Sequence, residues 1–397
     1  MLLQKPAFLL FYHARAAEAS FGEWLGVLWH GLSLDCTVAG YVTAFPVLVV
    51  LASFWIPLSQ RVWRIVLTVY FSLIALVTAA IFAVDLNLYG YWGFRLDGSV
   101  LIYLSDPGEA LASASWGEVL RQILIMLVYA GAMIWSYRWI LRLFRVEPVP
   151  LRGRVVPTVA ALLIGGLTFL AIRGGVTVAT ANVSKVYFSS NMFLNHAATN
   201  PVFSFLSSVG DNENYAEAYP FFEEERRKSL FEELRGNRPG ADAGTPRLLR
   251  SGRPNVVLIL LESFGRTIMD ETVNGEPVMP NMQRFKREGV WFENFFANSF
   301  RTDRGQVAVL CGFPAQTTMS IMKLPRKSAT LPSLARSLGR EGYRSAFMYG
   351  GDLNFTNQAS FMYSTGWEEL IWQKDMQLDA PTSKWGYADD VVDEFFG

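Results

Sequence analysis

Four long apolar segments constrain this chain more than any other feature of its sequence. Residues 42–57, 65–84, 123–140 and 155–172 each hold few or no charged side chains. A helix needs about 20 predominantly apolar residues to cross the hydrocarbon core of a bilayer, so runs of this kind predict spanning helices. The 397-residue chain is 51% hydrophobic, which is too apolar for an ordinary soluble protein of this size. We therefore expect an integral membrane protein, with the lipid bilayer as a partner.

A fifth apolar segment, residues 6–12, is too short to cross a bilayer alone. We interpret it as the end of a helix whose beginning lies outside this sequence. No small-residue cleavage pattern follows it, so a cleavable signal peptide is not predicted. Insertion is expected to depend on the spanning helices themselves.

The charges of the connections predict an orientation. Arg61 and Arg64 lie in one short connection, and the connection over residues 142–154 holds four arginines, whereas residues 85–118 carry mostly acidic charge. Basic connections tend to stay in the cytoplasm. The chain after about residue 173 is therefore expected outside the cell or in the periplasm, attached to the cell (inner) membrane.

Net charge and cysteine content exclude several functions. The formal net charge is zero, with no long run of like charge, so nucleic acid is not an expected partner. Cys36 and Cys311 lie far apart in sequence and have no metal-ligand spacing, which argues against a disulfide framework or a zinc site. We interpret both cysteines as small buried residues.

The sequence from residue 255 has the alternating strand and helix pattern of a doubly wound α/β domain. Residues 256–261 form a continuous apolar run, typical of a strand buried on both faces of a parallel sheet. Helices are predicted over 280–288 and 332–340, and strands over 290–292 and 345–349. Residues 174–254 precede this domain as a juxtamembrane connector and a polar linker, with a short surface helix expected over 229–234.

Two side chains stand where chemistry is expected. Glu262 and Ser263 follow the first predicted strand, at the sheet edge where ligands collect, and a carboxylate there can hold a divalent metal. Thr302 is placed as the N-cap of a helix that Gly312 ends, where free N–H groups stabilise a phosphate. Both residues also have purely structural interpretations, because glutamate can cap a turn and threonine is a common N-cap.

Several short motifs follow one another in this region. They are Glu262-Ser263-Phe264, Met279-Pro280-Asn281-Met282, Gly289, Phe292, Asn294, Arg301-Thr302-Asp303, Tyr349-Gly350-Gly351-Asp352, Phe355, Trp385-Gly386, Asp389 and Asp390. In this order and spacing they resemble the lipoteichoic acid synthase (phosphoglycerol transferase) branch of the sulfatase and alkaline phosphatase superfamily. Asn195-His196-Ala197 and Asn200-Pro201-Val202-Phe203 look like the connector of that branch.

The resemblance implies a multi-pass α-helical membrane domain (1–173), the connector (174–254) and an extracytoplasmic sulfatase-type α/β domain (255–397), incomplete at its C-terminus. It also implies an enzyme that moves a phosphoglycerol head group from phosphatidylglycerol to a glycan or lipid-linked acceptor of the cell envelope. Thr302 would be the nucleophile, and Glu262 with Thr302 would bind a divalent metal such as Mn²⁺. Arg301, Arg304 and Asp352 are candidate substrate-binding residues.

Two departures from the family pattern limit this transfer of roles. Where the family carries tryptophan and arginine for the donor head group, this chain has Phe355-Thr356-Asn357-Gln358. The remaining metal ligands of the family, including an Asp-His pair, lie further downstream, and the three histidines of this chain all precede the α/β domain. We therefore expect the sequence as given to lack part of the metal site and to be inactive by itself.

Three alternatives stay open. A phosphoethanolamine transferase of the same superfamily also couples membrane helices to an outward sulfatase-like domain. A hydrolase of free sulfate esters is disfavoured, because sulfatases carry cysteine or serine where this chain has Thr302. A non-catalytic membrane scaffold with the same fold is the alternative from a different functional class.

Overall fold

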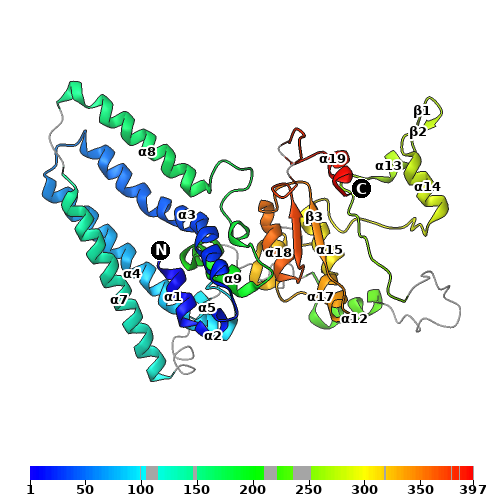
Figure 1. Ribbon diagram of the computed structural model, residues 1–397, viewed down its shortest axis with the longest axis horizontal. Helices are drawn as coiled ribbons and strands as arrows, with labels where there is room; N and C mark the ends of the chain where they lie inside the picture. The colour runs from blue at the N-terminus through cyan, green and yellow to red at the C-terminus, as the bar shows by residue number, and fades with distance from the viewer. Residues whose placement is uncertain are drawn as a thin grey trace. The chain divides into compact units, whose positions relative to one another are not determined.

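A computed structural model describes residues 1–98, 100–103, 115–145, 150–209, 221–235, 252–316, 319–376, 378–383 and 385–396. The chain divides into two compact units, Glu213–Thr302 and the remainder, Met1–Asn212 with Asp303–Gly397. The domain boundaries inferred above stay predictions, and each unit is described here by itself (Figure 1).

Four long helices confirm the predicted spans and make the chain a membrane protein. Each is long and apolar enough to cross a bilayer: α3 (Phe21–Ser53), α4 (Gln60–Trp92), α7 (Trp116–Leu143) and α8 (Val155–Arg173). Helix α3 begins well before the predicted run, because Ser20 and Glu23 form a capping box at its start. Ser115 and Glu118 start α7 in the same way.

The spanning helices pack as two pairs, α4 with α7 and α3 with α8. Phe71 stacks on Tyr137 with ring centroids 4.5 Å apart in the first pair. A Cβ at Gly40 would lie 3.1 Å from the backbone nitrogen of Ile172, so glycine permits the close approach of the second pair. Cys36 of α3 is exposed, which corrects the prediction of a buried residue, whereas Cys311 is buried as predicted.

Arg61 and Arg64 lie in the first turns of α4, which corrects the prediction that they belong to a connection. The start of α4 and the basic connection between α7 and α8 lie at the same end of these helices. The Gln60 side chain donates to the Phe144 carbonyl at 3.1 Å, which joins the start of α4 to the end of α7. The Trp55 indole donates to the Thr158 hydroxyl at 3.1 Å, which joins the end of α3 to the start of α8. The short helix η1 (Leu151–Gly153) lies within the connection between α7 and α8. This arrangement agrees with a single basic side, and the compartment it faces stays a prediction.

The N-terminal segment forms short helices, α1 (Gln4–Phe11) and α2 (His13–Ala16), that pack against the spanning helices. Phe8 and Leu9 of α1 are buried in the same apolar cluster as residues of α3 and α4. Residues 6–12 therefore contribute to a packed helix that begins at Gln4.

Two buried ion pairs connect these segments. The ammonium of Lys5 lies 2.6 Å from an Asp35 carboxylate oxygen, and Arg95 lies 3.0 Å from Asp85. Asp85 was predicted to begin an acidic connection, and this prediction is wrong. Helix α4 continues to Trp92, and Asp85 faces the interior because Arg95 returns to neutralise it.

The connector after α8 is built from short helices. They are η2 (Val183–Val186), α9 (Met192–Ala198) and α10 (Pro201–Ser208). The Asn200 side chain caps α10 and also donates to Asp35 at 2.7 Å, so the connector is bonded to α3. The short helix α5 (Val100–Tyr103) follows α4 in the chain.

Residues after Asp303 form helices beside a pair of parallel strands. β3 (Ala346–Tyr349) pairs in parallel with β4 (Glu369–Trp372), and the chain crosses between them through η4 (Phe355–Asn357) and α18 (Gln358–Ser364). This βαβ arrangement is the α/β unit that the sequence predicts. The other helices are α15 (Thr302–Cys311), η3 (Ile321–Lys323), α16 (Pro325–Ser328), α17 (Leu334–Arg340) and α19 (Asp389–Phe396).

The unit Glu213–Thr302 holds little regular structure in its described part. Its elements are α12 (Glu224–Arg235), α13 (Arg266–Met269), the pair β1 (Thr272–Val273) and β2 (Glu276–Pro277), and α14 (Pro280–Glu288). Helix α14 has the predicted bounds, and the predicted surface helix over 229–234 is part of α12. The strands expected over 256–261 and 290–292 do not form. Residues 256–261 are extended and exposed, and no described strand of their unit pairs with them.

Candidate active site

Thr302 is the first residue of helix α15, and its side chain is exposed. Its position agrees with the predicted N-cap to within the usual one-residue uncertainty of helix ends. The first turn of a helix presents backbone N–H groups without intrahelical partners, and the helix dipole favours negative charge there. An exposed hydroxyl at this place can approach a phosphate that those groups stabilise.

The other side of α15 is fixed in an apolar core. Val307 and Leu310 are 2% and 3% exposed and pack with Met322, Phe361 and Met362. The Gln358 amide donates to Gln306 at 2.7 Å, which joins α15 to α18. Gly312 ends the helix with a φ of +64°, a left-handed conformation that glycine adopts without strain. Packing on one side therefore holds the helix whose first residue is Thr302.

Burial suppresses the reactivity of the one thiol on this helix. Cys311 lies at the end of α15 inside the core, and burial raises the pKa of its thiol to about 11. Because the thiolate is the nucleophilic form, Cys311 is an inert core residue at neutral pH.

Glu262 lies in the turn that follows the extended segment 255–261, and its side chain is exposed. The next residue, Ser263, has a φ of +61°, which is uncommon outside glycine and makes the turn sharp. No hydrogen bond joins Glu262 to Thr302 in the part of the chain that the structure describes.

The described residues fit a divalent metal only in part. A catalytic or structural ion takes at least four ligands, counting water. Glu262 and Thr302 supply an exposed carboxylate and an exposed hydroxyl, which are oxygen donors of the type Mn²⁺ accepts. Among the residues that the structure describes, no group of three histidine, cysteine or acidic side chains gathers to complete such a site.

The three candidate substrate-binding residues have different surroundings. Arg301 is exposed, whereas Arg304 is only 8% exposed and belongs to the buried side of α15. Asp352 is half-buried, and its carboxylate accepts hydrogen bonds from the backbone and side-chain amides of Asn354 at 2.9 and 2.8 Å. Asp352 therefore stabilises a local turn. Its role in substrate binding is a separate proposal.

The backbone after Asp352 is strained. Thr356 and Asn357 have φ values of +54° and +64°. Asparagine tolerates this region, but a β-branched threonine there is an outlier that costs on the order of 1 kcal/mol. These residues lie in the segment that departs from the family pattern, and backbone strain of this kind often clusters at functional sites.

Contacts with the end of α4 and with the connector hold the part of the chain after Asp303 beside the membrane helices. Arg326 lies 3.1 Å from the Asp97 carboxylate, which follows α4, and its guanidinium stacks over Trp92. Asn182 donates to the carbonyl of Asn354 at 2.8 Å, and the Ser360 amide donates to Ser184 at 3.0 Å.

Sequence reasoning missed these contacts and also the buried pairs of Lys5 with Asp35 and of Arg95 with Asp85. A signal for the buried pairs was present, because isolated acidic residues in apolar helices are costly and usually have a specific partner. The contacts of Arg326 and Asn182 have no comparable sequence signal, since their partners lie far away in the chain.

Comparisons with known proteins agree with the motifs. Residues 254–396 match the Sulfatase family model. The chain is 35% identical over 153 residues to phosphoglycerol transferase I of Xanthomonas campestris pv. campestris (strain B100), covering 35% of this chain and 21% of that protein. It is 32% identical over 130 residues to lipoteichoic acid synthase 1 of Bacillus subtilis (strain 168), covering 30% of this chain and 19% of that protein.

The chain thus spans about a fifth of the length of these curated relatives. A solved protein of the alkaline phosphatase superfamily from Vibrio parahaemolyticus shares 30% sequence identity over 30% of each chain, with a TM-score of 0.28. The chain carries four apolar helices at its N-terminus, and its residues 254–396 are similar to the sulfatase family.

Proposed function

We propose that this protein is a membrane-anchored transferase that moves the phosphoglycerol head group of phosphatidylglycerol to a glycan or lipid-linked acceptor of the cell envelope. The observation that carries the proposal is the exposed Thr302 at the first turn of α15, within residues 254–396, which match the Sulfatase family model. The similarity of the chain to phosphoglycerol transferase I supports the choice of head group. Similarity to lipoteichoic acid synthase 1 supports the same class of reaction.

The proposed reaction has two steps, and both balance. In the first, the Thr302 oxygen attacks the phosphorus of the lipid. The bond from phosphorus to the diacylglycerol oxygen breaks, and the threonine proton leaves on that oxygen. In the second, an acceptor hydroxyl attacks the phosphorus of the glycerophosphoryl group on Thr302. The bond from phosphorus to the Thr302 oxygen breaks as the bond to the acceptor oxygen forms, and the acceptor's proton moves to the threonine oxygen.

The residues of this chain would assist in distinct ways. The first turn of α15 provides N–H groups and a dipole for the phosphoryl oxygens, and Arg301 adds a positive charge next to Thr302. Glu262 and Thr302 would contribute ligands to a divalent ion such as Mn²⁺, which would lower the pKa of the hydroxyl. Arg304 and Asp352 are the remaining candidates for substrate binding.

The membrane helices explain how the enzyme would reach its lipid donor. A lipid donor stays in the bilayer, so the enzyme must hold its nucleophile close to the membrane surface. The contacts of Arg326 with Asp97 and of Asn182 with Asn354 hold the part of the chain after Asp303 beside the helices, and this part contains α15 from its second residue onward. With the basic connections in the cytoplasm, this part faces the extracellular or periplasmic side of the cell membrane.

The test incubates the product of the complete gene, rather than residues 1–397 alone, with head-group-labelled lipids in the presence of Mn²⁺. Transfer from phosphatidylglycerol, lost in Thr302→Ala and retained in Thr330→Ala, is the expected result, because Thr330 is an exposed threonine outside the site. Transfer from phosphatidylethanolamine instead would favour the phosphoethanolamine transferase. No transfer from either lipid, together with an unchanged phenotype of Thr302→Ala, would favour the scaffold.

A further inference from the structure

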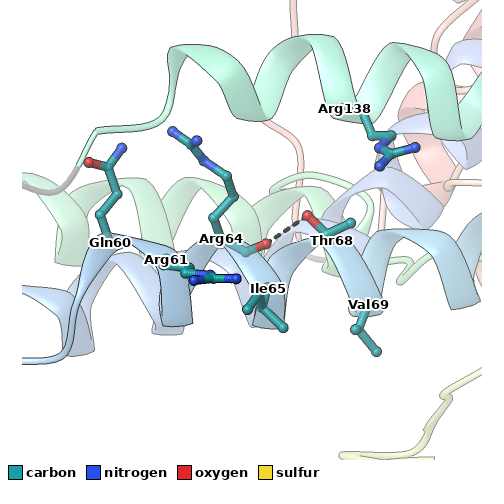
Figure 2. A pocket seen from close by; sticks show the side chains of 7 residues that line it. All are labelled: Gln60, Arg61, Arg64, Ile65, Thr68, Val69 and Arg138. Carbon is teal, nitrogen blue, oxygen red and sulfur yellow. Dashed lines mark hydrogen bonds between the residues drawn. The ribbon is translucent and has the colours of Figure 1, made fainter.

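A pocket at the basic end of the spanning helices has no role in the proposed reaction. It has a volume of about 560 Å³ and lies between α4 and α7. Figure 2 shows Gln60 and Arg64 extending from α4 toward α7, which contributes Arg138. Arg61, Ile65, Thr68 and Val69 of α4 complete the lining.

The charge in this pocket is all of one sign. Arg61, Arg64 and Arg138 line it without any acidic neighbour in the lining, and none of them forms an ion pair with a described carboxylate. Within the described residues, the polar contact from these guanidinium groups is the hydrogen bond from Arg64 to the Phe144 carbonyl at 3.4 Å. Three guanidinium groups that line one pocket repel one another, so an anion between them would be stabilised.

The three arginines lie near the ends of their helices, which places their charges at the membrane interface. Arg61 and Arg64 lie in the first two turns of α4, and Arg138 lies five residues before the end of α7 at Leu143. At about 1.5 Å per residue, all three are within roughly 8 Å of a helix end. Ser59 provides no side-chain cap to α4, so the positive end of that helix dipole adds to the same field.

The lining changes from polar to apolar along α4. Ile65 and Val69 are 53% and 54% exposed and lie one to two turns further from the helix start than Arg61. Thr68 satisfies its hydroxyl within the helix by donating to the Arg64 carbonyl at 2.7 Å. A soluble anion would use only the arginine end, whereas a lipid would use both ends.

We infer that this pocket binds an anionic glycerophospholipid, with the phosphate between Arg61, Arg64 and Arg138 and an acyl chain along Ile65 and Val69. Guanidinium groups bind phosphate through charge-assisted, often bidentate hydrogen bonds. Basic pockets between membrane helices are suited to lipid head groups. The inference rests on the membrane character of α4 and α7 and does not depend on the proposed transfer reaction.

The test measures lipid retention by the intact protein in detergent, using native mass spectrometry with added dioleoyl phosphatidylserine or dioleoyl phosphatidylcholine. Phosphatidylserine has the required net charge without being the proposed donor, so the result is independent of Thr302. The unaltered protein is expected to prefer phosphatidylserine. Arg64→Gln/Arg138→Gln is expected to weaken its binding at least tenfold and leave phosphatidylcholine unaffected.

Two controls make the test specific. Arg152→Gln removes an exposed arginine of the η1 connection and is expected to retain full binding. Arg64→Lys/Arg138→Lys keeps the charges and is expected to retain most of the binding. This variant tests the role of charge even if the glutamine variant folds poorly. Equal weakening by Arg152→Gln, equal binding of both lipids, or displacement by glycerol phosphate as effective as by lipid would each overturn the inference.

Discussion

His196 lies in the connector, and burial determines its protonation. Its Nδ1 is 3.1 Å from the hydroxyl of Tyr89, the side chain is 4% exposed, and burial, assisted by the positive charge of Arg95, lowers its pKa to about 3. His196 is therefore neutral in the folded protein at any physiological pH. This makes it a packing residue of the connector.

The depressed pKa predicts a pH dependence of stability. As the pH falls below about 6.5, the unfolded chain binds a proton at His196 that the folded chain excludes, so stability falls until the pH reaches about 3. Between about pH 7.5 and about pH 5 the expected loss is about 2 kcal/mol. Thermal unfolding in detergent should show a smaller difference between these pH values for His196→Gln than for the unaltered protein.

A matched substitution at an exposed site, His13→Gln, is expected to keep the original pH dependence. An unchanged pH dependence in His196→Gln would contradict the assignment of the effect to this histidine.

The ion pair of Lys5 with Asp35 predicts a second effect on stability. Both side chains are buried, so Asp35→Asn would leave the Lys5 ammonium without an anion and is expected to destabilise the fold by about 3–5 kcal/mol. The amide oxygen introduced by this substitution can still accept the hydrogen bond from Asn200. Lys5→Met/Asp35→Asn is therefore expected to recover most of the loss in a thermal unfolding assay. Equal instability of the single and double variants would show that charge burial is not the cause.

At the scale of elements, α3 and α8 pack closely because Gly40 has no side chain. Gly40→Val would place a Cβ 3.0–3.2 Å from side-chain and backbone atoms of Ile172 and Thr168, and overpacking of this kind costs about 1–3 kcal/mol. Gly131→Val in α7 is the matched control, because nothing lies within 4 Å of its Cβ position. The unfolding temperature should fall for the first variant alone, and an equal fall in both would show that close packing at Gly40 is not the cause.

Apolar length and capping residues were enough to predict the spanning helices and α14. They could not predict that α4 continues past Asp85, because this depends on the distant partner Arg95. The apolar run 256–261 is a case where the sequence predicts an element that does not form. Its pattern suits a buried parallel strand, but a strand forms only beside a partner, and no described strand of its unit lies beside it.

The candidate site was predictable only where it depends on residues that are close together in the sequence. The start of α15 at Thr302 follows from local signals, namely a capping residue before an apolar run and a glycine after it. The burial of Arg304 depends on the tertiary packing around α15, and the turn around Asp352 depends on its hydrogen bonds with Asn354, neither of which a local pattern reveals.

At the scale of the whole molecule, the basic connections predict which side of the membrane each part faces. In a Cys36→Ser background, Arg152→Cys is expected to react with a membrane-impermeant maleimide only after cells are permeabilised, because the η1 connection is cytoplasmic in the proposed orientation. Lys228→Cys in α12 is expected to react in intact spheroplasts. Cys311 is buried and stays unlabelled. The reverse labelling pattern would contradict the orientation.

The central claim is that Thr302 forms a covalent bond to a lipid phosphate at the membrane surface. Its most direct test is peptide mass spectrometry of the product of the complete gene after brief incubation with phosphatidylglycerol and Mn²⁺. The account predicts one phosphoglycerol group on Thr302, and no such adduct in Thr302→Ala. A phosphoglycerol adduct on another residue, or transfer activity that persists in Thr302→Ala, would contradict it.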